Sequence, residues 1–175
     1  MRLFLVIFIL FSHSAFAESY TQACFTTEDD TLQFILTSSF TSGSDLSWVA
    51  VAFEDEQCRK PYLKFSRYFK ITRVQNGEID LKSTKSTYTI LTDEVARALN
   101  LIGYCDLHNW QTGVETDVSG RKCEDYQQLQ IDQRFLQIFQ LTDSGLYWGR
   151  LDRLHDGLSP KNRPDQLETI PYLKR

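Results

Sequence analysis

The chain has 175 residues, with 19 Lys and Arg against 23 Asp and Glu, which gives a formal net charge of −4 at pH 7. This length suits one domain with its own hydrophobic core, and no repeat or low-complexity segment indicates another architecture. The acidic balance, without a dense cluster of basic residues, argues against nucleic acid as a partner.

Residues 1–17 have the composition of a secretory signal peptide. Arg2 precedes an unbroken apolar run over 3–11, and Ala-Phe-Ala at 15–17 matches the small-x-small pattern of signal-peptidase sites. The run is too short to span a membrane, and no later run is long enough, so an uncleaved anchor is the weaker alternative. We predict an exported protein, periplasmic or secreted, with one domain over 18–175 and no transmembrane segment.

Most of the first half of that domain is expected to form β-strands. Apolar residues recur at every second position in 31–40, and 46–53 is rich in β-branched and aromatic residues. The segment 62–74 alternates apolar and polar residues, and a threonine-rich strand is expected over 78–91. Asn76-Gly77 between these two segments is a strong signal for a tight hairpin.

The apolar face of 62–74 contains one exception. Arg67 interrupts it, although the residues on either side of Arg67 keep the alternation. The apolar positions are Leu63, Phe65, Phe69 and Ile71.

One helix is expected after these strands. Thr92 is a suitable N-cap, and acidic residues follow it, where the helix dipole favours negative charge. Gly103 ends the helix. An apolar stripe is predicted at Val95, Ala98, Leu99 and Ile102.

The second half of the domain also suggests strands. These are expected over 127–133, 134–143 and 146–151, with a turn at Asp-Ser-Gly between the last two. The proline-rich tail over 155–175 is expected to be an irregular strap or an edge strand. Six to eight strands, mostly joined by hairpins, indicate an antiparallel barrel or sandwich.

The four cysteines of an exported chain are expected to form two disulfides. Three pairings are possible, and we favour Cys24–Cys58 with Cys105–Cys123 because each closes a short loop within its own half of the chain. The alternative for the second pair is a zinc site, since Cys105-x-x-His108 has a ligand-like spacing. No second close pair of ligands accompanies it, so we expect no metal.

Catalytic motifs are not recognisable. The adjacent His155 and Asp156 are the weak basis for a hydrolase hypothesis, since neighbouring residues rarely face each other. Glu115 and Asp117 read as solvated carboxylates rather than an acid/base pair. The loop with Lys161 and Arg163 would suit an anion but reads as solvated, so we expect a non-enzymatic protein without a cofactor.

Aromatic residues, 13% of the sequence, suggest the walls of a cavity for an apolar ligand, although they would equally fill a solid core. The candidates are Trp48, Phe65, Phe69, Trp110, Phe135, Phe139, Tyr147 and Trp148.

Three blocks, over 53–65, 104–123 and 145–172, carry further patterns. They read Phe-x-Asp-x-x-Cys-x-x-Pro, Cys…Trp-x-x-Gly…Asp-Val-Ser…Cys and Leu-Tyr-x-Gly…Arg-Pro-x-x-Leu. In this order they resemble the adenomatosis-polyposis-coli-down-regulated (APCDD) domain family, from about residue 40 to the C-terminus. The resemblance implies a lipocalin-like antiparallel β-barrel with a hydrophobic cavity, a lipid ligand and no catalytic residues. Animal members antagonise Wnt signalling with two such domains on a membrane anchor, whereas this chain is similar to single-domain exported bacterial relatives.

Two main functional hypotheses follow. The first is an exported, disulfide-linked barrel that binds a lipid or other hydrophobic small molecule. The second is a solid-core module that binds a protein of the cell envelope, with Trp148 as an exposed anchor. The hydrolase is the third and weakest.

Overall fold

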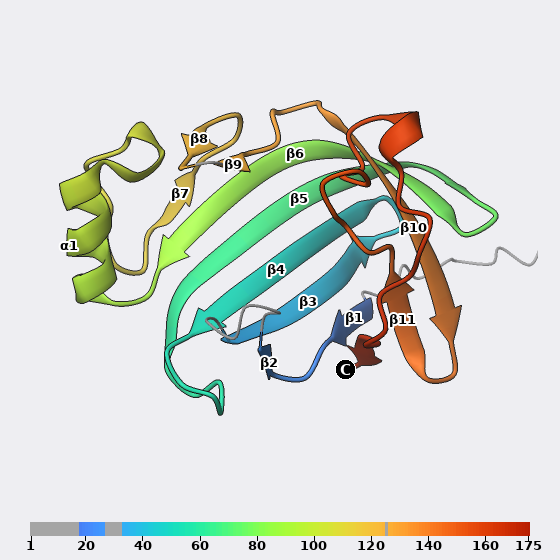
Figure 1. The fold of residues 1–175 in the computed structure, drawn as a ribbon, viewed down its shortest axis with the longest axis horizontal. Coiled ribbons are helices and arrows are strands. Elements are labelled where there is room, and N and C mark those ends of the chain that lie inside the picture. Colours follow the sequence, from blue (N-terminus) through green and yellow to red (C-terminus); the bar gives the residue numbers. More distant parts are fainter. Residues whose placement is uncertain (1–17, 27–32, 125) are drawn as a thin grey trace, which may run out of the picture.

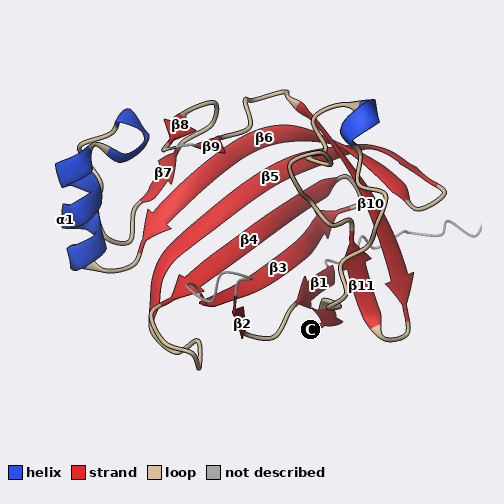
Figure 2. Ribbon diagram, in the orientation of Figure 1, coloured by secondary structure: helices blue, strands red, loops and turns tan. Residues whose placement is uncertain are grey.

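The computed structural model describes residues 18–26, 33–124 and 126–175, and the predicted signal peptide lies outside the described residues. The chain is mainly β, and its main antiparallel sheet curls into a nearly closed barrel (Figure 1, Figure 2). Both preferred disulfides are present, with S–S distances of 2.10 Å for Cys24–Cys58 and 2.02 Å for Cys105–Cys123. The predicted fold class is therefore confirmed.

The described residues form more strands than expected, because several are only two to four residues long. The elements are β1 (Glu18–Thr21), β2 (Phe25–Thr26), β3 (Gln33–Ser42), β4 (Asp45–Phe53), β5 (Pro61–Gln75), β6 (Glu78–Ile90), α1 (Asp93–Ile102), η1 (Tyr104–Asp106), β7 (Glu115–Asp117), β8 (Lys122–Cys123), β9 (Tyr126–Gln127), β10 (Arg134–Thr142), β11 (Gly145–Trp148), η2 (Pro160–Asn162) and β12 (Leu173–Lys174).

The barrel is an antiparallel series of strands in the order β11–β10–β6–β5–β4–β3–β1–β12. Its two ends approach each other where Leu146 of β11 and Tyr172, just before β12, exchange backbone hydrogen bonds of 2.9 and 2.8 Å. These bonds satisfy main-chain groups that an open sheet would expose at its edges. The C-terminal segment therefore links the two ends of the sheet and nearly closes the barrel.

The long hairpin of β5 and β6 extends across the molecule (Figure 1). Its turn is the predicted one: Asn76 and Gly77 have φ values of 53° and 78°, as a type I′ turn requires. The pairing shifts register between Tyr68 and Phe69 and again between Ile71 and Arg73. Such irregularities bend and twist a strand, which allows this hairpin to wrap around the interior.

The alternation predicted for 62–74 is confirmed by the pairing of β4 with β5. Phe69 lies opposite Leu46, Arg67 opposite Trp48, and Phe65 opposite Ala50, all on the interior face. Phe69 and Leu46 are fully buried. The main core contains Tyr20, Leu46, Phe69, Ile79, Leu81, Leu129, Phe135, Leu146, Trp148 and Tyr172.

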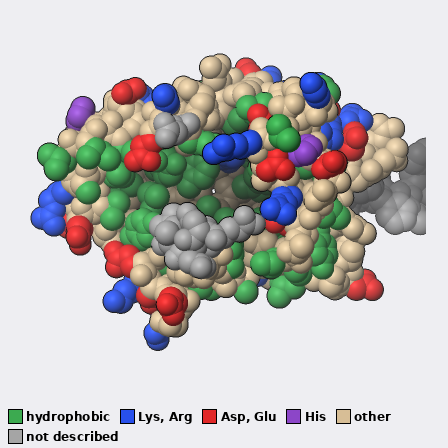
Figure 3. Space-filling view, viewed as in Figure 1, with side chains coloured by type: hydrophobic (Ala, Val, Ile, Leu, Met, Phe, Trp, Pro, Cys, Tyr) green, Lys and Arg blue, Asp and Glu red, His purple; other side chains and the backbone are tan. Residues whose placement is uncertain are grey.

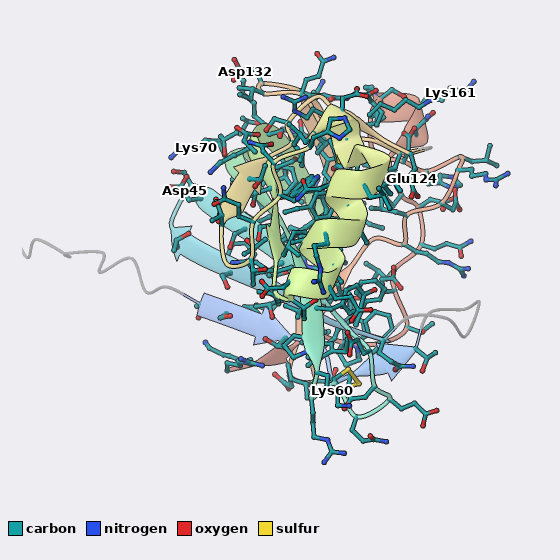
Figure 4. The ribbon with its side chains drawn as sticks, turned by 90° about the vertical axis from the view of Figure 1, so that its left-hand side faces the viewer. Asp45, Lys60, Lys70, Glu124, Asp132 and Lys161 are labelled. Carbon is teal, nitrogen blue, oxygen red and sulfur yellow. A yellow bond between two sulfur atoms is a disulfide. The ribbon has the colours of Figure 1, made fainter. Side chains whose placement is uncertain are left out.

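Helix α1 stands across one end of the sheet (Figure 4). Its predicted start is confirmed, since the Thr92 Oγ1 accepts a hydrogen bond of 3.4 Å from the Val95 N–H, and Gly103 has a left-handed φ of 65°. The predicted stripe is partly wrong, because Ala96 is the buried residue and Ile102 is 62% exposed.

The exposure of Ala98 and Ile102 follows from the way the helix packs. Only one side of α1, at Val95, Ala96 and Leu99, meets the second core. That core is a separate cluster that also contains Ile90, Trp110, Val118 and the Cys105–Cys123 disulfide. Among the described residues, no helix has both the length and the apolar character needed to cross a membrane.

The strand predicted over 127–133 is wrong beyond β9. Gln128 and Leu129 are both buried, so the alternation that a strand requires is lost, and Asp132 has a positive φ of 68°. The chain turns there, where the Gln133 Oε1 accepts a hydrogen bond of 2.8 Å from the Gln130 N–H.

The tail predicted over 155–175 is irregular for most of its length and ends in the short strand β12, so both expected features occur in it. The irregular part continues from residues 149–154, and we call residues 149–171 the strap. Figure 1 shows the strap in red, lying close to β10 and β11. Backbone hydrogen bonds join it to β10, from the Leu136 N–H to the Gly157 carbonyl at 2.8 Å and from the Gly149 N–H to the Ile138 carbonyl at 2.9 Å. A further bond of 2.8 Å joins it to β11, from the Glu168 N–H to the Trp148 carbonyl.

Candidate ligand-binding site

Five of the eight aromatic residues proposed from the sequence lie together inside the barrel. The Trp48 ring is central, with centroid distances of 5.4 Å to Phe69, 5.5 Å to Phe135 and 5.0 Å to Trp148. Phe139 lies 6.1 Å from Trp148. Three of these contacts are edge-to-face, a favoured arrangement of aromatic rings. We call these five residues the aromatic cluster.

The other three aromatic residues lie outside this cluster. Phe65 is further along β5, and Trp110 is buried in the second core beneath α1. Tyr147 alternates with Trp148 along β11, and its hydroxyl lies 3.1 Å from the Ser144 Oγ. Because Trp148 is only 3% exposed, its suggested role as a surface anchor is wrong.

A cavity of about 570 Å³ lies between the strap and the segment that leads into β10. Its size is within the range of small-molecule sites. Figure 3 shows this face of the molecule hollowed near its centre, with hydrophobic side chains on the left of the hollow and Lys or Arg side chains above it and on its right. The lining residues are Arg67, Tyr126, Gln127, Leu129, Gln133, Phe135, Leu151, Asp152, Arg153, Asp156 and Leu158.

The cavity is lined both by a residue of the aromatic cluster and by residues that were not proposed as binding residues from the sequence. Phe135 belongs to the cluster, whereas Leu129, Leu151 and Leu158 come from irregular segments. Periodicity carries no signal for such leucines because their positions depend on how the strap crosses the barrel. Asp152 and Asp156 bring acidic groups to the same cavity.

A smaller cavity of about 160 Å³ is also lined by Arg67. Arg67 lines both cavities, and it is the residue that they share. The smaller cavity is otherwise lined by Leu36, Thr37, Ser38, Trp48, Val49, Ala50, Phe65 and Tyr172.

Arg67 is only 8% exposed, and its guanidinium lies between two aromatic rings. Its Cζ is 5.0 Å from the centroid of Phe65 and 5.4 Å from that of Tyr126. The Nη2 group donates a hydrogen bond to the Tyr126 hydroxyl. Arginine often stacks on aromatic rings in this way, through cation–π attraction. The sequence marked Arg67 as an interruption of an apolar face but gave it no functional role.

The His155 and Asp156 pair is not a catalytic arrangement in this structure. His155 lies 3.1 Å from the Asp152 carboxylate and 3.7 Å from that of Asp165. Asp156 instead accepts hydrogen bonds from the Leu158 N–H and from the Asn162 side chain. The hydrogen bond to Asp152 raises the pKa of His155, while desolvation opposes the shift.

The remaining polar candidates have structural partners. Glu115 accepts hydrogen bonds from the Lys85 ammonium at 2.8 Å and from the Tyr68 hydroxyl at 3.3 Å. His108 Nδ1 lies 2.9 Å from the Asn100 carbonyl. Arg163 donates to Asp80. Within the described ranges, no group of His, Cys, Asp and Glu side chains has the geometry of a metal site.

Comparison of the chain with models of known protein families gave no match, and a search of curated proteins found none with significant similarity. The resemblance to the APCDD family therefore stays a prediction.

Proposed function

We propose that the protein acts after export by binding a hydrophobic small molecule of the lipid class, without catalysis, in the mouth of its barrel. The main support is the cavity of about 570 Å³ between the strap and the barrel wall. Apolar side chains from three parts of the chain, Leu129, Phe135 and Leu158, converge on this space. Burying an apolar ligand there would release water from both surfaces.

The two disulfides support the export step of the proposal, because such bonds persist in oxidising compartments. The resemblance to the APCDD family, for which a lipid-binding barrel is expected, supports the same class of ligand. A hydrolase finds less support, since His155 interacts with Asp152 and no serine, threonine or cysteine side chain of the described residues is hydrogen-bonded to it.

The direct test is native mass spectrometry of protein purified without reductant from cells that express the full chain. The expected mass lacks four hydrogens relative to the reduced protein, because two disulfides have formed. A lipid-sized adduct that is removed by collisional activation is also expected. Stripped protein should then take up the neutral probe N-phenyl-1-naphthylamine with increased fluorescence.

Two leucines of the strap provide a matched pair of variants. Leu151 lines the cavity, whereas Leu154 is 75% exposed and is not part of the lining. Leu151→Glu should weaken probe binding about 5- to 10-fold, as expected for losing part of one leucine's apolar contact. Leu154→Glu adds the same charge nearby and should leave affinity unchanged. Absence of both adduct and probe uptake in folded protein would overturn the proposal.

A further inference from the structure

A row of side chains that carry polar groups crosses the interior at Arg67, beside the aromatic cluster. Strand pairing places Ser38 opposite Trp48, Trp48 opposite Arg67, and Arg67 opposite Ser86. Residues directly opposite each other in an antiparallel sheet project to the same face. The four side chains therefore form a continuous row on the interior face of strands β3 to β6, which we call the polar row.

Three groups of the polar row are buried and have no hydrogen-bond partner in the part of the chain that the structure describes. They are the Nε1 of Trp48, the Nε of Arg67 and the Oγ of Ser86. No described carboxylate forms an ion pair with Arg67, whose one hydrogen bond is to the hydroxyl of Tyr126. Buried polar groups are normally paired, and an unpaired buried charge is especially unfavourable.

Ser38, by contrast, already has a partner within the protein. Its Oγ accepts a hydrogen bond of 2.8 Å from the Nε1 of Trp148. The unsatisfied part of the row is thus confined to Trp48, Arg67 and Ser86, which are adjacent through strand pairing.

We propose that these three residues bind the anionic head group of an amphipathic ligand, specifically a carboxylate attached to an apolar chain. This inference rests on the proposed function and names the chemical class of its ligand. The planar guanidinium of Arg67 matches the geometry of a carboxylate, and the indole N–H of Trp48 and the hydroxyl of Ser86 are further donors. Arg67 is the one cation of the polar row, so a monoanion balances its charge.

The two cavities indicate how the ligand lies. Because Arg67 lines both of them, a head group bound to it sits at their junction. The larger cavity adds Leu129, Phe135 and Leu158, which suit an alkyl chain extending toward the strap. The rings of Phe65 and Tyr126 hold the guanidinium between them, so the anchor is ordered before the ligand arrives.

The test compares two ligands that differ only in the head group. Stripped, unreduced protein is titrated with dodecanoate and with 1-dodecanol at pH 7.5, and affinity is measured by calorimetry. Dodecanoate should bind about 10- to 100-fold more tightly, the ratio expected for charge-assisted hydrogen bonds. Arg67→Met should reduce the affinity for dodecanoate to that for dodecanol and leave the affinity for dodecanol unchanged.

Two further variants refine the result. Arg67→Lys keeps the charge but lacks the planar fork, so its affinity for dodecanoate should be intermediate. Arg97→Met removes an exposed arginine on α1 and should alter neither affinity. If Arg67→Met does not fold, Trp48→Phe, which deletes the N–H donor and keeps an aromatic ring, should weaken dodecanoate binding several-fold and dodecanol binding no more than slightly.

The outcomes separate this inference from the proposed function. Equal binding of both ligands by the native protein and by Arg67→Met would overturn the inference and leave an apolar-ligand carrier. The same conclusion follows if Trp48→Phe weakens both ligands equally. Failure of the native protein to bind either ligand would overturn both proposals.

Discussion

Asp80 is predicted to fix the strap to the barrel. Its buried carboxylate accepts hydrogen bonds from Arg73 at 3.1 Å, Arg134 at 2.7 Å and Arg163 of the strap at 2.5 Å. Burial alone would raise the pKa of Asp80. The hydrogen bonds from the three arginines outweigh burial and hold this pKa well below its usual range. Replacing Asp80 with Asn removes the charge that all three share.

The size of the effect depends on which arginines remain buried. Removing one partner of a buried ion pair commonly costs about 3–5 kcal/mol. Here the side chains of Arg73 and Arg134 are 41% and 58% exposed, so hydrogen bonds to water replace much of the interaction with Asp80 that they lose. Arg163 is 12% exposed but keeps two backbone carbonyls, at 3.2 and 2.7 Å. For Asp80→Asn we expect a loss of about 2–3 kcal/mol, which lowers Tm by roughly 4–12 °C.

The assay is urea and thermal unfolding followed by circular dichroism at pH 7. Asp132→Asn is the control, because this exposed carboxylate pairs with Lys82 on the surface, and its loss should cost less than about 0.5 kcal/mol. The folded pKa of Asp80 is depressed, so its stabilisation is present above the unfolded pKa of about 4 and is lost as pH falls through the folded value. The difference in the free energy of unfolding between the native protein and Asp80→Asn should therefore become smaller below pH 4.

Equal unfolding midpoints for Asp80→Asn and Asp132→Asn at pH 7 would refute this reasoning. The reasoning would also be refuted if this difference in the free energy of unfolding stayed constant from pH 7 down to the lowest pH at which the protein folds. The charge of the Asp80 carboxylate would then not be the source of the stabilisation.

Two further predictions concern the disulfide of the second core and the histidine of the strap. Replacing Cys105 and Cys123 together with Ser should lower the free energy of unfolding by about 3 kcal/mol, as measured in urea, because the bond closes an 18-residue separation; an unchanged midpoint would contradict this. The pKa of His155, followed by NMR, should lie above its ordinary value of about 6.5 and fall in Asp152→Asn, because the hydrogen bond that the imidazole donates to the Asp152 carboxylate raises it. The His155–Asp152 attraction is full below the ordinary pKa and is lost as pH rises through the folded value. Protection of the strap amides, expressed relative to the intrinsic exchange rate at each pH, should therefore decrease over that rise.

Features that depend on a few neighbouring residues were predictable from the sequence. The Asn76-Gly77 turn and the Thr92 cap each follow from backbone geometry within four residues. The alternation of 62–74 also identified the correct interior face, since strand side chains alternate strictly between faces. The aromatic cluster follows from the same alternation in adjacent strands.

Features that depend on distant contacts were not predictable. Barrel closure joins Leu146 to Tyr172, whose segment has no strand pattern of its own. The exposed end of α1 reflects where the helix meets the second core, which its stripe does not specify. The cavity needs the strap to cross the barrel, so its leucines became visible only in three dimensions. Arg67 was visible as an exception, but the lack of a hydrogen-bond partner for its Nε among the described residues was not.

Ser38 and Ser86 test whether the polar row contains both structural and ligand-facing groups. Both are buried interior serines on the row, but among the described residues only Ser38 has a hydrogen-bond partner for its side chain. Ser38→Ala leaves the buried indole N–H of Trp148 unpaired and should destabilise the fold by about 1–3 kcal/mol. Ser86→Ala removes a hydroxyl that is already unpaired, so stability should stay within about 0.5 kcal/mol or increase. The backbone N–H of Ser86 keeps its bond to Ser119 in this variant.

Urea unfolding of the two alanine variants, without ligand, distinguishes a structural serine from one that does not stabilise the fold. Titration with dodecanoate then tests whether Ser86 contacts the ligand. If the unpaired hydroxyl of Ser86 serves the ligand, Ser86→Ala should bind dodecanoate less tightly although it is no less stable than the native protein. Equal destabilisation by Ser38→Ala and Ser86→Ala would mean that both hydroxyls stabilise the fold in the same way. The contrast between a paired and an unpaired serine would then carry no information about a ligand, and the assignment of the polar row would lose one of its three donors.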